Sequence, residues 1–211
     1  MSYQTLLDAV IKGDIKTAKE ETLKAVDAGQ NAQDILDQGL IEAMNVVGDN
    51  FFKGSIFVPQ MFRSAKTMQE CVEVLKPHFQ ENAMTTKGNI VLGTVKGDLH
   101  DIGKNLVGMM LEGAGFNIID LGVDVAPEVF VDKIKEANAD VLGMSALLST
   151  TMPSMSLTIK ALADLGLRDT VKVIIGGAPV TRKYAEDIGA DSYASDAGAA
   201  VHETKKLLNI T

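Results

Sequence analysis

The sequence predicts a two-domain α/β protein: an N-terminal four-helix bundle, then a domain built on a five-stranded parallel sheet. Two observations predict this fold. Apolar residues recur at helical spacing from residue 3 to about residue 79, and beyond residue 88 short β-rich runs alternate with helical ones. With 211 residues, the chain is long enough to bury two small cores.

Four segments have the helical spacing of the first domain. Gly13-Asp14 and Gly29-Gln30-Asn31 separate the first three segments. Pro59 lies near the start of the fourth, where its missing N–H costs little. The apolar positions are Leu6, Leu7, Val10 and Ile11, then Ala18, Leu23 and Val26, then Ile35, Leu36, Leu40, Ala43, Met44 and Val47, then Val58, Met61, Phe62, Met68, Val72 and Leu75.

A change of hydrophobic periodicity marks the domain boundary. The polar stretch over residues 80–88 ends in Gly88 and is predicted to be a linker, so the domains are residues 1–87 and 88–211. The strands are predicted over residues 89–95, 116–120, 140–145, 171–175 and 191–194, and the helices over residues 102–114, 127–137, 152–166, 181–188 and 197–208. This alternation indicates a parallel sheet with helices on both faces, which is a Rossmann-like or flavodoxin-like arrangement.

Composition excludes several classes of function. The net charge of -8 and the pI near 4.9 argue against a nucleic-acid surface, and no apolar run approaches the roughly 20 residues that cross a bilayer. The start Met1-Ser2-Tyr3-Gln4 lacks the basic and apolar regions of a signal peptide, and the one cysteine cannot form an internal disulfide. We therefore expect a cytoplasmic protein.

Three motifs fall at the ends of predicted strands. Gly97 and the run Asp98-Leu99-His100-Asp101-Ile102-Gly103 follow the first strand, Ser145-Ala146-Leu147 closes the third, and Gly176-Gly177 ends the fourth. Ligands of open parallel sheets bind at this carboxyl edge. An imidazole there is a good metal ligand, and Asp98 is the expected hydrogen-bond partner of His100. The alternative is a flavodoxin-like domain with incidental loop residues.

Taken together, the three motifs resemble the Asp-x-His-x-x-Gly, Ser-x-Leu and Gly-Gly signature of cobalamin-binding domains, over residues 88–211. The resemblance implies a cobalamin held base-off, with His100 as the cobalt ligand and Asp98 as its partner in a proton relay. Thr151 occupies the position where family members with a fuller relay have serine. Asp101 is assigned to the surface or to helix capping.

The resemblance also implies how the cofactor is held. Ser145 and Ser149 would hydrogen-bond the displaced base, Leu147 would wall its slot, and the two glycines would leave room for the nucleotide tail. Ala197 belongs to the segment 193–197 that closes over the tail in related domains. The cofactor-binding residues predicted in this domain are Gly97, Asp98, His100, Asp101, Ile102, Gly103, Ser145, Leu147, Ser149, Gly176, Gly177 and Ala197.

Residues 44–61 resemble the cap domain that precedes the cobalamin domain in methionine synthase and in small corrinoid methyl carriers. In that family apolar cap residues shield the methyl group, and the matching positions are Phe51, Val58 and Met61. The alternative for each is ordinary bundle core. A cap must move to admit a partner, which makes the linker over residues 80–88 the expected hinge.

The resemblance implies a non-catalytic corrinoid protein of a methyltransferase system. It would carry a methyl group on cobalt from a substrate:corrinoid methyltransferase to a second methyltransferase acting on a thiol or tetrahydrofolate, and a reductive activase is the third expected partner. Alternatives are the cobalamin-binding subunit of a radical mutase and a cobalamin-based sensor. The methyl donor stays open among methylamines, methanol, glycine betaine and methoxylated aromatics.

Overall fold

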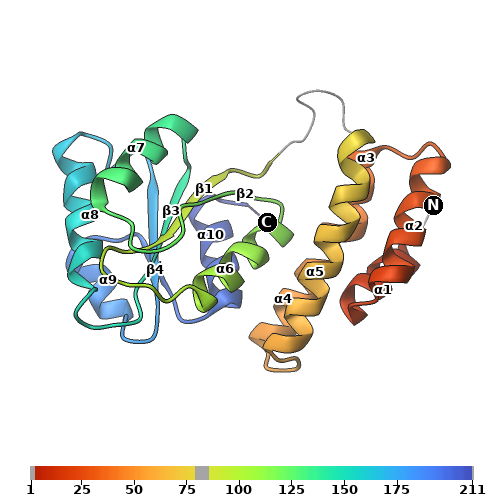
Figure 1. Cartoon of the computed structure of the whole chain (residues 1–211), viewed down its shortest axis with the longest axis horizontal. Coiled ribbons are helices and arrows are strands. Elements are labelled where there is room, and N and C mark those ends of the chain that lie inside the picture. Colours follow the sequence, from red (N-terminus) through yellow and green to blue (C-terminus); the bar gives the residue numbers. More distant parts are fainter. Residues whose placement is uncertain (1–2, 79–85, 211) are drawn as a thin grey trace. The chain divides into compact units, whose positions relative to one another are not determined.

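The computed structural model describes residues 3–78 and 86–210. The chain divides into an N-terminal helical unit that extends to Thr86 and an α/β unit that starts at Lys87 (Figure 1). Most of the predicted linker over residues 80–88 lies outside the described residues. Within the described residues, no helix is both long and apolar enough to span a membrane.

The helical unit has the four predicted helices, the third of which is interrupted by a π-helical stretch. Asp14 begins the second helix by accepting a hydrogen bond from the Thr17 amide, 3.2 Å, and Asn31 begins the third by accepting one from the Gln33 amide, 2.8 Å. The elements are α1 (Gln4–Lys12), α2 (Ile15–Asp27), α3 (Ala32–Ile35), η1 (Leu36–Ile41), α4 (Glu42–Phe52), α5 (Val58–Leu75) and η2 (Lys76–His78). The core of this unit includes the fully buried Val10, Ile35, Leu40, Met61 and Leu75.

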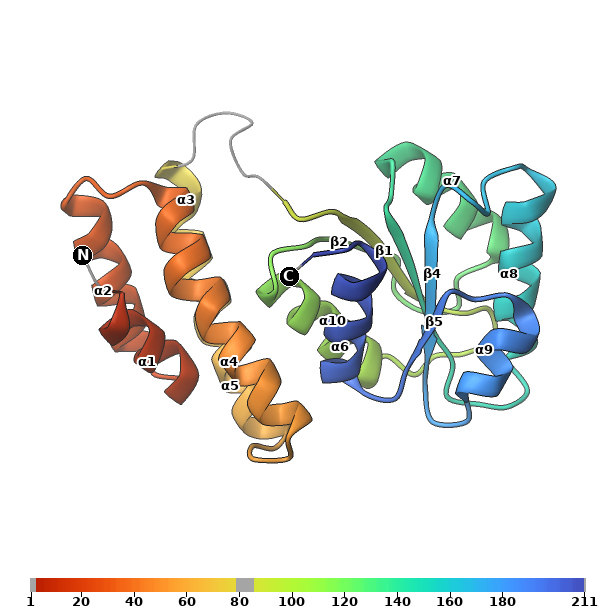
Figure 2. The ribbon, with the colours of Figure 1, turned by 180° about the vertical axis from the view of Figure 1, so that it is seen from behind.

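The α/β unit is a five-stranded parallel sheet, as the sequence predicts, and its strand order is β2-β1-β3-β4-β5. Its strands are β1 (Asn89–Thr94), β2 (Asn117–Asp120), β3 (Val141–Ser145), β4 (Lys172–Gly176) and β5 (Ser192–Ala194). Its helices are α6 (Ile102–Gly113), α7 (Pro127–Ala137), α8 (Pro153–Asp164), α9 (Arg182–Ile188) and α10 (Ala197–Leu207). Figures 1 and 2 show α6 and α10 on one face of the sheet and α7, α8 and α9 on the other.

The strand register places the ends of four strands at one level. Thr94 pairs with Ser145, Ser145 with Gly176, and Gly176 with Ala194. The strand order reverses between β1 and β3, because the chain leaves β1 for β2 on one side and later returns to β3 on the other. In open parallel sheets this switch point is where ligands bind, so the loops after β1 and β3 form the candidate site.

Candidate functional site

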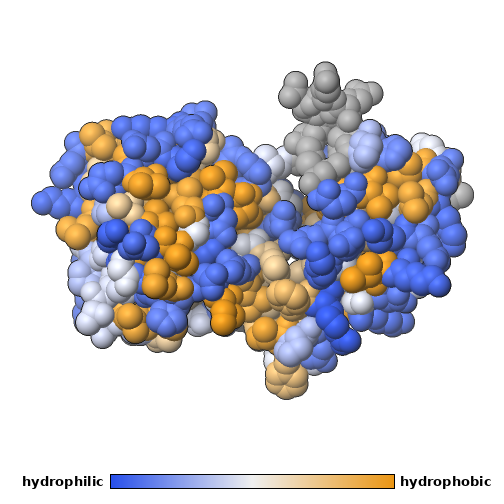
Figure 3. Space-filling view, in the orientation of Figure 1, coloured by the Kyte–Doolittle hydropathy of each residue, from blue (hydrophilic) through white to orange (hydrophobic). Residues whose placement is uncertain are grey.

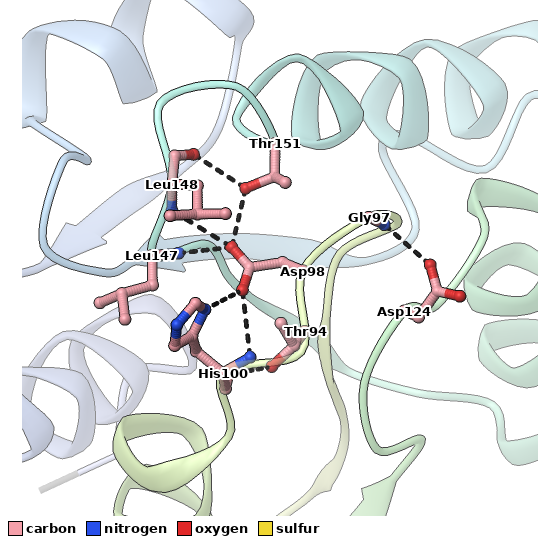
Figure 4. Close-up of polar contacts among 8 residues, drawn as sticks. All are labelled: Thr94, Gly97, Asp98, His100, Asp124, Leu147, Leu148 and Thr151. Atoms are coloured by element: carbon pink, nitrogen blue, oxygen red, sulfur yellow. Dashed lines mark hydrogen bonds and ion pairs between the residues drawn. The ribbon is translucent and has the colours of Figure 1, made fainter.

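The buried carboxylate of Asp98 joins the loop after β1 to the loop after β3 (Figure 4). Its Oδ2 accepts hydrogen bonds from the amides of Leu147, 2.7 Å, and Leu148, 3.2 Å, and from the hydroxyl of Thr151, 2.7 Å. Its Oδ1 accepts from the amide of His100, 3.1 Å, and faces the His100 Nδ1 atom at 2.7 Å. Five donors therefore converge on one side chain that has no exposed surface.

These donors decide the charge of Asp98. Burial by itself raises the pKa of the carboxyl group, but the hydrogen bonds from Leu147, Thr151 and His100 outweigh that effect and hold the pKa well below its usual 3.8. An ionised carboxylate can only accept hydrogen bonds. The proton shared by the pair therefore lies on His100 Nδ1, so the lone pair of the neutral imidazole lies on Nε2.

His100 presents that nitrogen at the surface of the sheet edge. Its side chain is 51% exposed, and no described residue hydrogen-bonds its Nε2 atom. The neighbouring Leu99 and Ile102 are 71% and 84% exposed, so the loop of His100 also presents two apolar side chains to solvent. The backbone behind it is fixed, because the Thr94 hydroxyl donates to the His100 carbonyl oxygen, 3.0 Å.

Thr151 lies just before α8 and is 7% exposed. Its hydroxyl is 2.7 Å from Asp98 Oδ2 and 2.8 Å from the Leu148 carbonyl oxygen. A hydroxyl has one proton to donate, and an ionised carboxylate is the stronger acceptor of the two. The side chain thus completes a His100–Asp98–Thr151 chain of hydrogen bonds, which is the arrangement that the motif resemblance implies.

The structure places the other predicted residues of the α/β unit around the same edge. Ser145 is the half-buried last residue of β3, Ser149 is exposed in the following loop, and Leu147 is 43% exposed. Asp101 directly precedes α6; its carbonyl oxygen accepts the first helical hydrogen bond from the Asn105 amide, 2.7 Å, and its Oδ2 accepts one from the Asn105 side-chain amide, 3.1 Å. Ala197 is the buried first residue of α10.

The glycines differ in why they are needed. An added Cβ at Gly177 would lie 1.9 Å from the Ala146 carbonyl oxygen, and Gly177 also has a φ of 127°. The fold itself therefore requires glycine at position 177, with or without a bound cofactor. At Gly103 a Cβ would meet nothing within 4 Å, so the protein itself does not require a glycine at that position.

In the helical unit the three predicted residues have different environments. Val58 is 45% exposed and Phe51 is half-buried, whereas Met61 is completely buried in the core of the unit. Sequence reasoning missed Phe57, which is 68% exposed, and named Phe62, which is 48% exposed, only as an apolar position of the fourth helix. The space-filling view shows hydrophobic residues on the surface of both units (Figure 3).

An ion pair made by a buried lysine was also missed. Lys104, the third residue of α6, has almost no exposed surface, and its ammonium group contacts Asp120 at the end of β2. Its position directly after the Asp98–Gly103 motif is the only sequence signal. A lysine at the start of a helix is otherwise expected in solvent.

His100 offers one ligand atom, which fits a metal whose other ligands come from a macrocyclic cofactor. Among residues 3–78 and 86–210, no group of three or more His, Cys, Asp or Glu side chains could hold a metal ion. His202, in α10, is 74% exposed, and Cys71 is buried in α5. A single imidazole supplies one ligand position, which suits a cobalt already held by the four nitrogens of a corrin ring.

Comparisons with known proteins agree with this class of site. Two models, each described as a B12 binding domain, match residues 88–202 and residues 3–76. Dimethylamine corrinoid protein 1 of Methanosarcina acetivorans is 44% identical over 99% of this chain and 100% of its own length. Trimethylamine corrinoid protein 2 of the same organism is 40% identical over 95% of this chain and 94% of its own.

A solved structure gives the same answer. The methanol:cobalamin methyltransferase complex of Methanosarcina barkeri contains a chain that aligns with a TM-score of 0.90 and 28% identity, covering 99% of this chain and 80% of that one. The chain therefore belongs to the B12-binding corrinoid proteins of methyltransferase systems. The prediction of a corrinoid cofactor on a Rossmann-like domain with an N-terminal helical domain is confirmed.

Proposed function

We propose that this protein is a non-catalytic methyl carrier that moves between a substrate:corrinoid methyltransferase and a second methyltransferase acting on a thiol or on tetrahydrofolate. When bound, the corrinoid supplies a cobalt atom that accepts and gives up a methyl group. The observation that carries the proposal is the His100–Asp98 pair at the carboxyl edge of the sheet, in a chain whose relatives are corrinoid proteins. A reductive activase is the further partner we infer.

The role of Asp98 in this proposal is to orient and polarise the imidazole. Because the carboxylate stays ionised, it keeps the proton on His100 Nδ1 and directs the Nε2 lone pair outward. Thr151 and the Leu147 amide hold the carboxylate in place from the loop after β3. The hydrogen bonds that a proton relay from His100 through Asp98 to Thr151 requires are present, and the relay itself stays a prediction.

We assign the remaining edge residues to the cofactor in two groups. Gly97, Asp101, Ile102 and Gly103 lie in or beside the loop of His100 and would face the corrin ring. The second group lies at the ends of β3 and β4 and at the start of α10, and would contact the nucleotide tail. Its members are Ser145, Leu147, Ser149, Gly176, Gly177 and Ala197.

We infer that the helical unit, within the proposed domain of residues 1–87, is the cap that excludes water and oxidants from the methyl group. Exposure favours Phe57, Val58 and Phe62 as its apolar contact residues, with Phe51 beside them. Met61 would act through packing beneath them, since it is fully buried. The segment over residues 80–88 would join the cap to the cofactor domain, residues 88–211.

Methylated amines are the donor class that we favour. Relatives that match almost the whole chain are named for dimethylamine and trimethylamine, whereas the methanol-system relative has lower identity. The test loads the protein with hydroxocobalamin, reduces it, and supplies monomethylamine, dimethylamine, trimethylamine or methanol with the matching purified methyltransferase. We expect the methylcorrinoid spectrum with an amine, and no methylation by any donor would contradict the carrier function.

A matched pair of variants separates the site from the surface. His100→Ala should lose most of the methylation, because the cobalt loses its protein ligand. His202→Ala changes an exposed histidine in the same unit and should behave like the wild type. Equal losses in both variants would argue against the site assigned here.

A further inference from the structure

A second acidic residue, Asp124 in the loop after β2, hydrogen-bonds to the loop that contains Asp98 and His100. Asp124 Oδ1 accepts a hydrogen bond from the Gly97 amide, 2.8 Å (Figure 4), and its Oδ2 accepts one from Lys96 Nζ, 3.2 Å. The Asp124 amide in turn donates to the carbonyl oxygen of Asp98, 3.0 Å. One residue thus holds three consecutive residues of the loop.

The two loops also meet through their backbones. Val95 and Val125 form an isolated parallel bridge, and the Val125 amide donates to the Thr94 carbonyl oxygen, 3.0 Å. The Thr94 amide donates to the Gly122 carbonyl oxygen, 2.9 Å. The backbone on both sides of Asp124 is therefore hydrogen-bonded to the end of β1.

Both residues that form this contact have a positive φ, which is uncommon for a residue other than glycine. Asp124 has a φ of 55° and Gly97 a φ of 85°, both in the left-handed region. An aspartate adopts that conformation less readily than glycine does. The Gly97 amide, followed by Lys96, holds the pKa of Asp124 below its ordinary value, so the acceptor is a carboxylate at neutral pH.

The opposite side of the loop is held as well. The Ser154 hydroxyl donates to the Lys96 carbonyl oxygen, 3.2 Å, and the methyl group of Thr151 lies 3.5 Å from the position of a Cβ built on Gly97. The loop after β1 is therefore hydrogen-bonded to Asp124 on one side and to Ser154 of α8 on the other. The exposed Lys96–Asp124 ion pair adds little to this by itself, because salt bridges in solvent are weak.

We propose that Asp124 is a positioning residue for the cobalt ligand: by holding Lys96, Gly97 and Asp98 it fixes the direction in which His100 presents its Nε2 atom. The proposal deepens the function proposed above, on which its second readout rests. Asp124 is separate from the His100–Asp98–Thr151 chain, because it binds the backbone of Gly97 and Asp98 and the side chain of Lys96, and not the imidazole or its carboxylate.

Three variants test the proposal. Asp124→Gly suits the positive φ and removes the side-chain contacts to Lys96 and Gly97 without adding backbone strain, while the backbone amide contact to Asp98 can remain. Asp124→Asn keeps an acceptor oxygen and tolerates the same φ. Asn138→Gly is the matched control, because Asn138 also has a positive φ, 45°, but ends α7 at the other edge of the sheet.

The first readout uses the protein without cofactor. The exchange of the His100 Nδ1 proton with solvent is followed by NMR on protein labelled with ¹⁵N-histidine. We expect about tenfold faster exchange in Asp124→Gly, the effect of losing one hydrogen bond to a charged acceptor, with Asp124→Asn and Asn138→Gly near the wild type. Unchanged exchange in Asp124→Gly, or equal changes in both glycine variants, would overturn the proposal.

The second readout uses protein loaded with hydroxocobalamin and reduced to Co(II). The equilibrium constant for histidine ligation, measured from the nitrogen splitting in the electron paramagnetic resonance spectrum, should fall about tenfold in Asp124→Gly and be restored in Asp124→Asn. Wild-type ligation in Asp124→Gly would overturn the proposal. Absence of histidine ligation in the wild type would instead contradict the proposed function, while the exchange experiment still decides whether Asp124 positions the imidazole.

Discussion

Replacing Asp98 with asparagine tests the account of the site without any cofactor. The carboxylate accepts hydrogen bonds from five donors, and an amide has only one oxygen. If the new NH₂ group replaces Oδ2, the amides of Leu147 and Leu148 lose their acceptor. If it replaces Oδ1, the amide of His100 loses its acceptor, whereas the imidazole ring can change tautomer and accept a hydrogen bond from the new NH₂ group at Nδ1.

The amide therefore leaves two backbone donors without an acceptor in one orientation and one in the other. Each unsatisfied donor costs about 1–3 kcal/mol, so we expect Asp98→Asn to lower the free energy of unfolding of the α/β unit by roughly 1–3 kcal/mol. Urea unfolding followed by tyrosine fluorescence measures this, because Tyr184 and Tyr193 both belong to that unit. The same change at Asp101, whose carboxylate accepts one exposed hydrogen bond, should cost less than about 0.5 kcal/mol. Equal stability of Asp98→Asn and the wild type would refute the reasoning.

Three further predictions concern the same unit. The pKa of Asp98 is lowered in the folded state, so its stabilising effect is present at neutral pH and is lost as the pH falls below 3.8. The free energy of unfolding of the wild type should therefore fall more steeply with decreasing pH there than that of Asp98→Asn. Parallel plots of stability against pH for the two proteins would contradict this. Gly177→Ala should cost more than about 3 kcal/mol in urea unfolding, since its Cβ would collide with the Ala146 carbonyl oxygen, whereas Gly103→Ala should stay within about 1 kcal/mol and alter only corrinoid affinity. Thr151→Val should cost about 1–2 kcal/mol in thermal unfolding and Thr151→Ser less than half of that, because serine keeps the hydroxyl; the reverse order would count against the hydrogen bond to Asp98.

Much of the fold was predictable because both units are built from regular periodicities. The alternation of apolar runs gave every strand of the sheet to within two residues at each end, and Asp14 and Asn31 marked helix starts through their capping side chains. The π-helical stretch Leu36–Ile41 was not predictable, because its apolar spacing is hard to distinguish from that of a continuous α-helix. Local signals thus specify the elements, while small departures from regularity depend on packing.

The contacts of the site were harder to predict than its location. The motif spacing placed Asp98, His100 and Ser145 at one sheet edge, but not the amides of Leu147 and Leu148 that hold the carboxylate, because a backbone donor has no sequence signature. Asp124 was missed for a related reason: it acts on the backbone of Gly97 from another loop. Contacts between loops depend on three-dimensional proximity, which periodicity does not encode.

The sequence also did not predict which apolar side chains of the helical unit are exposed. Met61 and Phe62 are neighbours in an apolar stretch, yet Met61 is buried and Phe62 is 48% exposed. One residue of rotation, 100° on a helix, decides which side chain faces the core. Phe57 precedes α5 and lies outside the helical periodicity altogether.

The most direct test of the central claim is the cobalt ligand itself. Protein labelled with ¹⁵N-histidine is loaded with cobalamin, reduced to Co(II) and measured by electron paramagnetic resonance, beside His100→Ala and His202→Ala. The account predicts a splitting in the wild type that changes on ¹⁵N labelling, persists in His202→Ala and disappears in His100→Ala. The same isotope-sensitive splitting in His100→Ala would show that another histidine binds the cobalt and would contradict the site described here.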